Sequence, residues 1–282
     1  MSEISKGKVY IVLSAIIFGL MPLGASLAYR GGSNALQLVF FRLSVVLPLY
    51  WFLARKKGQS LKLTRKQAVQ IQFLSLGFTF TPISLYLSYY YIDSGVATTL
   101  HFMYPLIVVM ACWIFYAEKP GLKMWLCLLL TLIGLFMNMP RESAGILGIV
   151  LALISALTYA FYVVYLAKSG LRELGSMALL FHICLFGSLQ TGLVTTLFKS
   201  WSPMNAFGVI ASLVFALVVS FGAMSFQKGT FIIGPQKASI LSTLEPLTSI
   251  LVGLLLLGDK ISLISGSGLV LILLSSFVLS IE

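Results

Sequence analysis

The chain has 282 residues, of which 59% are hydrophobic and 10% are charged, and its formal net charge is +11. A soluble globular protein carries about 25% charged residues, so this composition excludes a soluble protein with a polar surface. The basic residues lie mainly in short segments between apolar runs. In that position they set membrane orientation, which argues against a nucleic-acid partner.

Apolar runs of about 20 residues recur from end to end, as in proteins built from membrane-spanning helices. Polar and Gly/Pro punctuation divides them into ten predicted spans, covering approximately residues 8–29, 35–54, 67–91, 95–117, 121–139, 144–167, 175–198, 204–230, 235–257 and 261–281. The first follows Lys6 and Lys8 and resembles a secretion signal, but it is long enough to span a bilayer, so we predict a retained helix. The sequence therefore predicts an all-α polytopic protein of the lipid bilayer.

An even number of spans places both termini on the same side of the membrane. If that side is the cytoplasm, the inner loops hold thirteen Lys and Arg residues and the outer loops hold four. The thirteen are Lys6, Lys8, Arg55, Lys56, Lys57, Lys62, Arg65, Lys66, Lys119, Lys123, Lys168, Arg172 and Lys237, and the four are Arg30, Arg141, Lys199 and Lys260. By the positive-inside rule, we predict a protein of the cytoplasmic membrane with cytoplasmic termini.

The two halves of the chain resemble each other. The segment IDSGVATTLHFMYPL (92–106) matches IGPQKASILSTLEPL (233–247) when Pro105 is set on Pro246. The same offset aligns the acidic–basic pairs that follow, EK in the first half and DK in the second. We therefore predict that spans one to five repeat as spans six to ten.

The predicted repeats cover residues 1–142 and 143–282. Because each has an odd number of helices, the second enters the membrane from the opposite side, and inverted-topology repeats are typical of transporters. A duplication without transport is the alternative. The chain has no HExxH motif and no convincing paired-carboxylate or Ser/His spacing, so we expect no enzyme and no catalytic residues. Its three cysteines lie inside apolar runs without a CxxC pair, so we expect no disulfide, metal site or cofactor.

The sequence resembles the EamA-type branch of the drug/metabolite transporter superfamily. The resemblance rests on Arg42 in FFRLSVV of the second span and on two proline-bearing spans that end in charged pairs, YPLIVVMACWIFYAEKP and LEPLTSILVGLLLLGDK. It implies ten helices in two five-helix repeats and a transport activity. It also implies supporting or dimerising last helices in each repeat, which is compatible with a homodimer. The second repeat carries His182 at the aligned place of Arg42.

Five ionisable side chains inside the predicted spans are candidates for substrate binding or coupling. They are Arg42, His101, His182, Lys228 and Glu245. A charge near the bilayer centre costs about 2.5–3.5 kcal/mol on insertion scales, so such residues are functional candidates and need partners. For the histidines the alternative is hydrogen-bonded packing. Arg42 lies about a third of the way into its span and can snorkel outward, which favours a structural or gating role over substrate binding.

Glu245 directly precedes Pro246 near the middle of the ninth span. At helical spacing it shares a polar face with Ser239, Ser242 and Ser249. Proline lacks an N–H and crowds the carbonyl four residues back, so Pro246 is expected to break the helix and free the carbonyl of Ser242. A broken helix beside a buried carboxylate suits a cationic group or a proton. The structural alternative is an ion pair between Glu245 and Lys228, unless Lys228 snorkels to its span end.

Pro105 is expected to break the fourth span in the same way, beside His101 and Tyr104. The inverted repeat would place this pair opposite Ser242 and Glu245 across a shared site near the midplane. Histidine titrates near neutral pH, and burial can bring a carboxylate into the same range. Either group is therefore a candidate for coupling substrate movement to protons.

Two pairs of tyrosines are expected to share helix faces with this site. Tyr86 and Tyr90 are four residues apart in the third span, and Tyr159 and Tyr162 are three apart in the sixth. Aromatic faces beside a carboxylate hold organic cations. The alternative for each tyrosine is ordinary packing or an interfacial belt.

These features favour a secondary transporter of a small polar metabolite, an amino acid or related amine, that works by alternating access with proton coupling or exchange. The alternative within transport is an exporter of lipophilic or quaternary cations, because one carboxylate with tyrosines would suit such a substrate. Lys228 and His101 argue against a purely cation-selective cavity. An intramembrane enzyme and a channel are further alternatives, and the chain has no Walker motif for ATP.

Overall fold

The computed structural model describes residues 2–92, 94–137, 145–252 and 263–280. Every regular element in these ranges is a helix. In chain order they are α1 (Glu3–Gly19), α2 (Met21–Arg30), α3 (Ala35–Ser44), α4 (Leu47–Lys56), α5 (Arg65–Ser88), α6 (Ser94–His101), α7 (Tyr104–Tyr116), α8 (Leu122–Met137), α9 (Ile146–Lys168), the 3-10 helix η1 (Leu171–Leu174), α10 (Ser176–Leu197), α11 (Ala206–Ile233), α12 (Pro235–Leu241), α13 (Leu244–Val252) and α14 (Leu263–Ser280).

Within the described ranges, seven helical segments are long and apolar enough to cross a membrane. Three of them combine two consecutive helices, namely α1 with α2, α3 with α4, and α6 with α7. Two shorter apolar helices lie within α8 and α14. The prediction of a multi-pass helical membrane protein is confirmed, while the number of ten spans stays a prediction.

The two expected helix breaks are present. Regular α-helical hydrogen bonding is interrupted between α6 and α7, just before Pro105, and between α12 and α13, just before Pro246. The carbonyl of Ser242 is not free, however, because it accepts a hydrogen bond from the Glu245 N–H at 3.0 Å. The expectation of a vacant carbonyl beside Glu245 is therefore wrong. The chain forms a 3-10-type turn, in which the Ser242 carbonyl bonds to the N–H three residues later.

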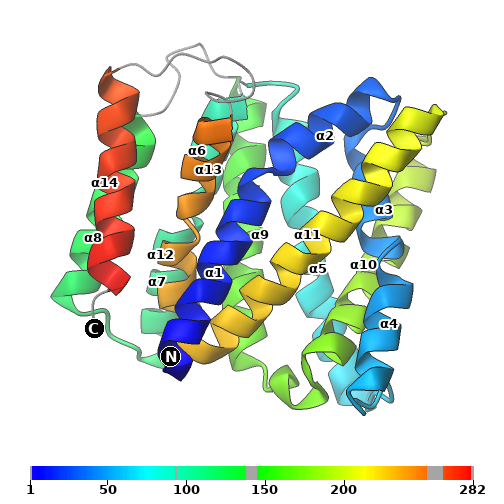
Figure 1. Ribbon diagram of the computed structural model, residues 1–282, viewed down its shortest axis with the longest axis horizontal. Coiled ribbons are helices and arrows are strands. Elements are labelled where there is room, and N and C mark those ends of the chain that lie inside the picture. The colour runs from blue at the N-terminus through cyan, green and yellow to red at the C-terminus, as the bar shows by residue number, and fades with distance from the viewer. Residues whose placement is uncertain (1, 93, 138–144, 253–262, 281–282) are drawn as a thin grey trace.

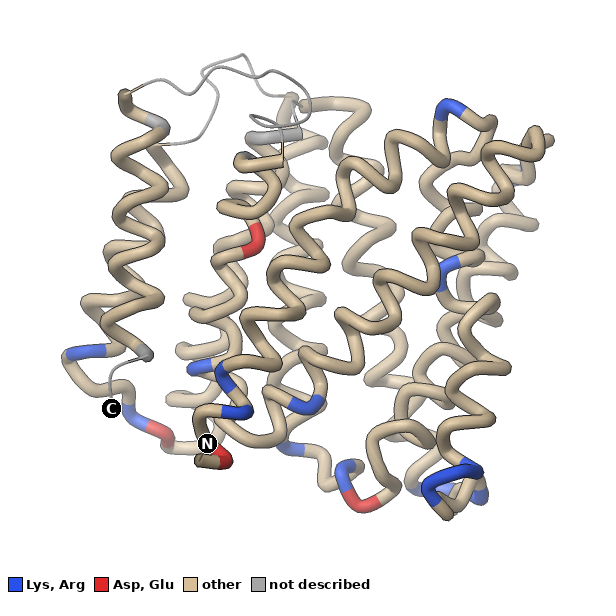
Figure 2. The backbone as a smooth tube through the Cα atoms, in the orientation of Figure 1, with Lys and Arg blue, Asp and Glu red and all other residues tan. Residues whose placement is uncertain are grey.

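The helices form one bundle in which segments far apart in sequence lie side by side. α1 packs along α11, α5 along α9, and α8 along α14; the α8–α14 pair stands at one side of the bundle (Figure 1). α1 begins and α14 ends at the same end of the bundle (Figure 1), which we call the termini end. Figure 2 shows that most Lys and Arg residues gather there. That this end faces the cytoplasm stays a prediction.

Glycines let α1 and α11 approach closely. A Cβ atom on Gly7 would lie 2.6 Å from Ile233, and one on Gly229 would lie 2.6 Å from Ile11. Small residues at such crossings are the usual way that membrane helices pack. The contact fixes the end of α11 beside the start of α1, at the termini end.

Candidate substrate cavity

A cavity of about 490 Å³ runs from the middle of the bundle toward the end opposite the termini. We call it the outer cavity. Glu245 and His101 line its inner part, and Tyr29 and Arg30 at the last turn of α2 line its outer part. Because Tyr29 and Arg30 are exposed, the cavity is accessible from the end opposite the termini.

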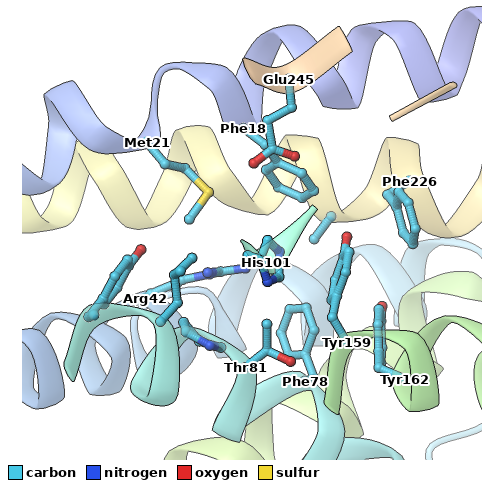
Figure 3. Close-up of a pocket in the computed structure, with 14 residues that line it drawn as sticks. Phe18, Met21, Arg42, Phe78, Thr81, His101, Tyr159, Tyr162, Phe226 and Glu245 are labelled. Atoms are coloured by element: carbon cyan, nitrogen blue, oxygen red, sulfur yellow. The ribbon is translucent and has the colours of Figure 1, made fainter. Parts of the chain in front are cut away.

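A smaller space of about 60 Å³ continues the outer cavity inward, and we call it the cavity floor. Both spaces share Phe18, Met21, Leu85, Tyr86, His101 and Glu245. The floor adds Arg42, Phe78, Thr81, Pro82, Tyr159, Tyr162, Ala223 and Phe226. In Figure 3 the side chains of Glu245, Arg42, His101 and Tyr159 converge on this space from different helices.

The Glu245 carboxyl group and the Arg42 guanidinium line the cavity floor without forming an ion pair. Among the described residues, the Glu245 carboxylate is not within 4.0 Å of any cationic nitrogen. The Arg42 guanidinium lies 5.2 Å from the ring centroid of Phe78. In a low-dielectric interior an uncompensated charge is unfavourable, so each side chain would be stabilised by a partner of complementary charge.

Arg42 is buried at 8% exposure and does not snorkel outward, which corrects that expectation. It occupies the wall of the floor because α3 packs against α10 and α5, with Phe78 of α5 beneath the guanidinium. Tyr86 lines the same space as Arg42, and its hydroxyl makes no hydrogen bond to a described residue. Arg42 and Tyr86 thus present unused donors at the cavity.

His101 is held in one orientation by Ser155. The two groups are 3.0 Å apart from Nδ1 to Oγ, and the Ser155 hydroxyl donates its own hydrogen to the Ala152 carbonyl at 2.6 Å. Nδ1 of His101 must therefore carry the hydrogen that joins the pair, and Nε2 is left as an acceptor. His101 lines both the outer cavity and the floor, so it adds an acceptor to the wall that holds Glu245.

Tyr104 lies below the floor and links the two halves of the chain. Its hydroxyl hydrogen-bonds to the Ser242 hydroxyl and lies 3.4 Å from the Ser239 carbonyl. The expected meeting of His101–Tyr104 with Ser242–Glu245 is thus visible in the structure, with Tyr104 and Ser242 as the direct contact. Ser249, on the same predicted face as Glu245, lines the outer cavity and donates to the Gly19 carbonyl at 2.8 Å.

A stack of aromatic rings closes the floor toward the termini end. Tyr159 and Tyr162 of α9 lie 5.9 Å apart between ring centroids, and Tyr162 lies 6.4 Å from Phe226 of α11. Beyond this stack, Glu118 and Lys168 form an ion pair between the ends of α7 and α9. Gln236 of α12 donates to the Glu118 carbonyl at 3.1 Å. The aligned Asp259–Lys260 pair lies outside the described residues.

Three residues expected at the site lie elsewhere. The Lys228 ammonium is 5.3 Å from the Tyr10 ring centroid and makes no ion pair with Glu245, because it leaves α11 on the side of α1, away from the cavity. Tyr90 is 71% exposed, since α5 ends at Ser88 and the four-residue spacing no longer keeps Tyr90 beside Tyr86. His182 is buried, and its Nδ1 lies 2.7 Å from the Ala178 carbonyl. This arrangement matches the alternative of hydrogen-bonded packing.

The model of the EamA-like transporter family matches this sequence twice, over residues 5–139 and 146–281. The chain belongs to this family. The resemblance to EamA-type transporters is therefore confirmed, and the protein is a multi-pass membrane transporter rather than an enzyme. The boundaries between the two repeats, placed at residues 142 and 143, stay a prediction.

Curated transporters and a solved structure are similar to this chain. The uncharacterized inner membrane transporter YicL of Salmonella typhimurium is 28% identical over 297 residues, which cover 100% of this chain and 97% of YicL. The uncharacterized transporter sll1319 of Synechocystis sp. is 28% identical over 71% of this chain, and the match spans 63% of sll1319. A solved crystal structure superimposes with a TM-score of 0.80 over 98% of this chain and 97% of the other, at 14% identity, which shows a shared fold.

Several lining residues of this EamA-type cavity escaped sequence reasoning. Phe18, Met21 and Phe226 are apolar residues in apolar helices, so nothing in their type separates them from lipid-facing neighbours. Phe226 had one usable signal, because the alignment that sets Pro105 on Pro246 also sets it on Leu85, another lining residue. Ser155 gave no signal, since its role depends on where His101 meets α9.

Proposed function

We propose that this transporter moves a small polar metabolite with an ammonium group and a carboxylate, an amino acid or a closely related amine, across the cytoplasmic membrane. The observation that carries the proposal is that an acidic and a basic side chain, Glu245 and Arg42, line one cavity without forming an ion pair. A zwitterion would place its ammonium at Glu245 and His101 and its carboxylate at Arg42. It would thereby compensate both buried charges at once.

The mechanism proposed is alternating access by two inverted five-helix repeats. The cavity is accessible from the end opposite the termini and closed toward the termini end by the ring stack and by the Tyr104–Ser242 contact. Sites at the interface of inverted repeats, formed by broken helices, are typical of such carriers. When the substrate leaves, Glu245 needs either a proton or another substrate, which supports proton coupling or exchange.

Export of lipophilic or quaternary cations is the second candidate. Tyr86, Tyr159 and Glu245 all line the cavity floor, and aromatic faces with a carboxylate attract organic cations. Arg42 in the same floor opposes this reading, because a permanent cation repels a substrate that carries only positive charge.

Thermal unfolding of the purified protein with amino acids, decarboxylated amines and quaternary ammonium compounds tests the proposal. A ligand at about 100 times its dissociation constant stabilises the folded protein by about 2.7 kcal/mol. We expect an amino acid to stabilise the wild type and to lose this effect in both Glu245→Gln and Arg42→Gln. Glu118→Gln, which removes a carboxylate outside the cavity, should keep it. Stabilisation by quaternary ammonium compounds alone would replace the proposal with the multidrug candidate.

A further inference from the structure

Two polar residues on α11 are buried without a hydrogen-bond partner. Gln227 and Thr230 are 0% and 1% exposed, and they are three residues apart on one helix face. Both amide atoms of Gln227 and the hydroxyl of Thr230 lack a partner among the described residues. Native proteins pair nearly all buried polar groups, because an unpaired one is unfavourable. A second state in which these side chains meet water or a ligand would remove that cost.

The position of these residues places them beyond the closed side of the cavity. Ala223 and Phe226 of α11 line the cavity floor, and Phe226 belongs to the ring stack that closes it. Gln227 and Thr230 follow toward the end of α11, which packs against the start of α1 at the termini end. They therefore lie on the termini side of the floor, where this conformation has no opening.

The internal repeat gives these residues counterparts on the open side. The alignment that sets Pro105 on Pro246 continues without a gap along the preceding helices. It pairs Tyr86 with Gln227 and Tyr89 with Thr230. Tyr86 and Tyr89 both line the outer cavity. When inverted repeats exchange conformations, the surface that one repeat exposes to one membrane face is replaced by the equivalent surface of the other repeat at the opposite face.

We propose that Gln227 and Thr230 line the cavity of the opposite-facing conformation and form part of the substrate path to the termini end. This inference rests on the alternating access of the proposed function. The amide and hydroxyl groups each donate and accept hydrogen bonds, so they suit water and a small polar solute. The two halves of the path then differ in chemistry, with tyrosines on one side and an uncharged polar wall on the other.

Cysteine labelling in oriented membrane vesicles tests this path with the full-length transporter. Gln227→Cys is compared with Tyr89→Cys, the repeat counterpart of Thr230, using a charged maleimide that does not cross the membrane and is added to one face at a time. An epitope tag at the N-terminus identifies the face that carries the termini. Phe221→Cys, a 51% exposed position on α11, controls for reaction at the lipid surface. The background variant replaces with alanine the three native cysteines, Cys112, Cys127 and Cys184.

We expect Gln227→Cys to react at least about tenfold faster from the termini face, and Tyr89→Cys at least about tenfold faster from the opposite face. Reaction of Gln227→Cys from the opposite face would overturn the proposal. The proposal would also be overturned if Gln227→Cys reacted from neither face in vesicles prepared like those in which Tyr89→Cys reacts. Thr230→Cys provides the same test if the Gln227 variant does not fold.

The labelling requires no substrate, so its failure is distinguishable from failure of the proposed function. If amino acids fail to stabilise the protein but the two cysteines react from opposite faces, the lining role stands and the amino-acid proposal falls. If amino acids stabilise the wild type but Gln227→Cys reacts from the wrong face, only the lining role is overturned.

Discussion

At the scale of single residues, buried amides in this transporter differ in how well they are paired. The Gln37 side chain donates to the Ser202 carbonyl at 3.0 Å and accepts from the Ser202 hydroxyl at 2.7 Å. Gln227 is equally buried and has no partner among the described residues. The Gln37 amide links α3 to the segment before α11. The Gln227 amide is unpaired and therefore destabilises the conformation described.

Replacement of Gln227 by leucine is therefore expected to stabilise this conformation. Gln227→Leu fills a similar volume and removes the unpaired amide, whose burial costs about 1–3 kcal/mol. We expect the free energy of unfolding to rise within that range, measured by thermal unfolding in detergent. The matched variant Gln37→Leu should lower it, because the Ser202 carbonyl would lose the amide that donates to it. A lower melting temperature for Gln227→Leu would contradict the prediction.

At the scale of helices, the α1–α11 crossing holds the second half of the chain against the first. Its geometry depends on positions where α11 has no side chain. A Cβ atom on Gly229 would lie 2.6 Å from Ile11 and 3.0 Å from the Gly7 carbonyl oxygen. A side chain at this point must displace either the Ile11 side chain or the two helices themselves.

Gly229→Ala is expected to lower the free energy of unfolding by about 1–3 kcal/mol, the usual cost of overpacking. Gly121→Ala is the matched control, because a Cβ atom at that position meets nothing within 4 Å. The melting temperatures of the two variants in detergent provide the comparison. Equal melting temperatures would show that Ile11 moves aside without cost.

At the scale of the whole molecule, the closed termini end is held by contacts between helices that belong to different halves. Lys168 at the end of α9 pairs with Glu118 after α7, and Gln236 of α12 donates to the backbone of Glu118. The ion pair is partly exposed, with 22% and 42% of its side-chain surfaces accessible. Pairs of this kind contribute at most about 1 kcal/mol.

Lys168→Gln is therefore expected to favour the opposite-facing conformation by a small factor. The labelling rate of Gln227→Cys from the termini face should rise by up to about fivefold, because about 1 kcal/mol corresponds to that ratio. Lys6→Gln serves as the control, since Lys6 pairs with Glu3 inside α1 and links no two helices. An unchanged labelling rate in Lys168→Gln would show that the ion pair does not stabilise the closed termini end.

Local patterns in the sequence are enough to identify the class of protein and the points where its helices are interrupted. Inside a membrane the backbone N–H and C=O groups of a long apolar run must bond to one another, which a helix achieves. Pro105 and Pro246 interrupt those helices because proline lacks an N–H and crowds the preceding turn. Motifs at repeating positions determined the family. All of these signals depend on neighbours along the chain, so they are readable before the chain folds.

Which polar residues face one another depends on the packing between helices. From the sequence, Arg42 could snorkel outward, and an ion pair between Lys228 and Glu245 was the structural alternative. In the structure Arg42 lines the cavity floor and Lys228 packs over Tyr10. Tyr90 left the site because α5 ended two residues earlier. Such outcomes depend on helix rotation and crossing, which are set by packing between segments far apart in sequence. Residue type and spacing therefore identified candidate site residues, and the contacts between helices determined which of them line the cavity.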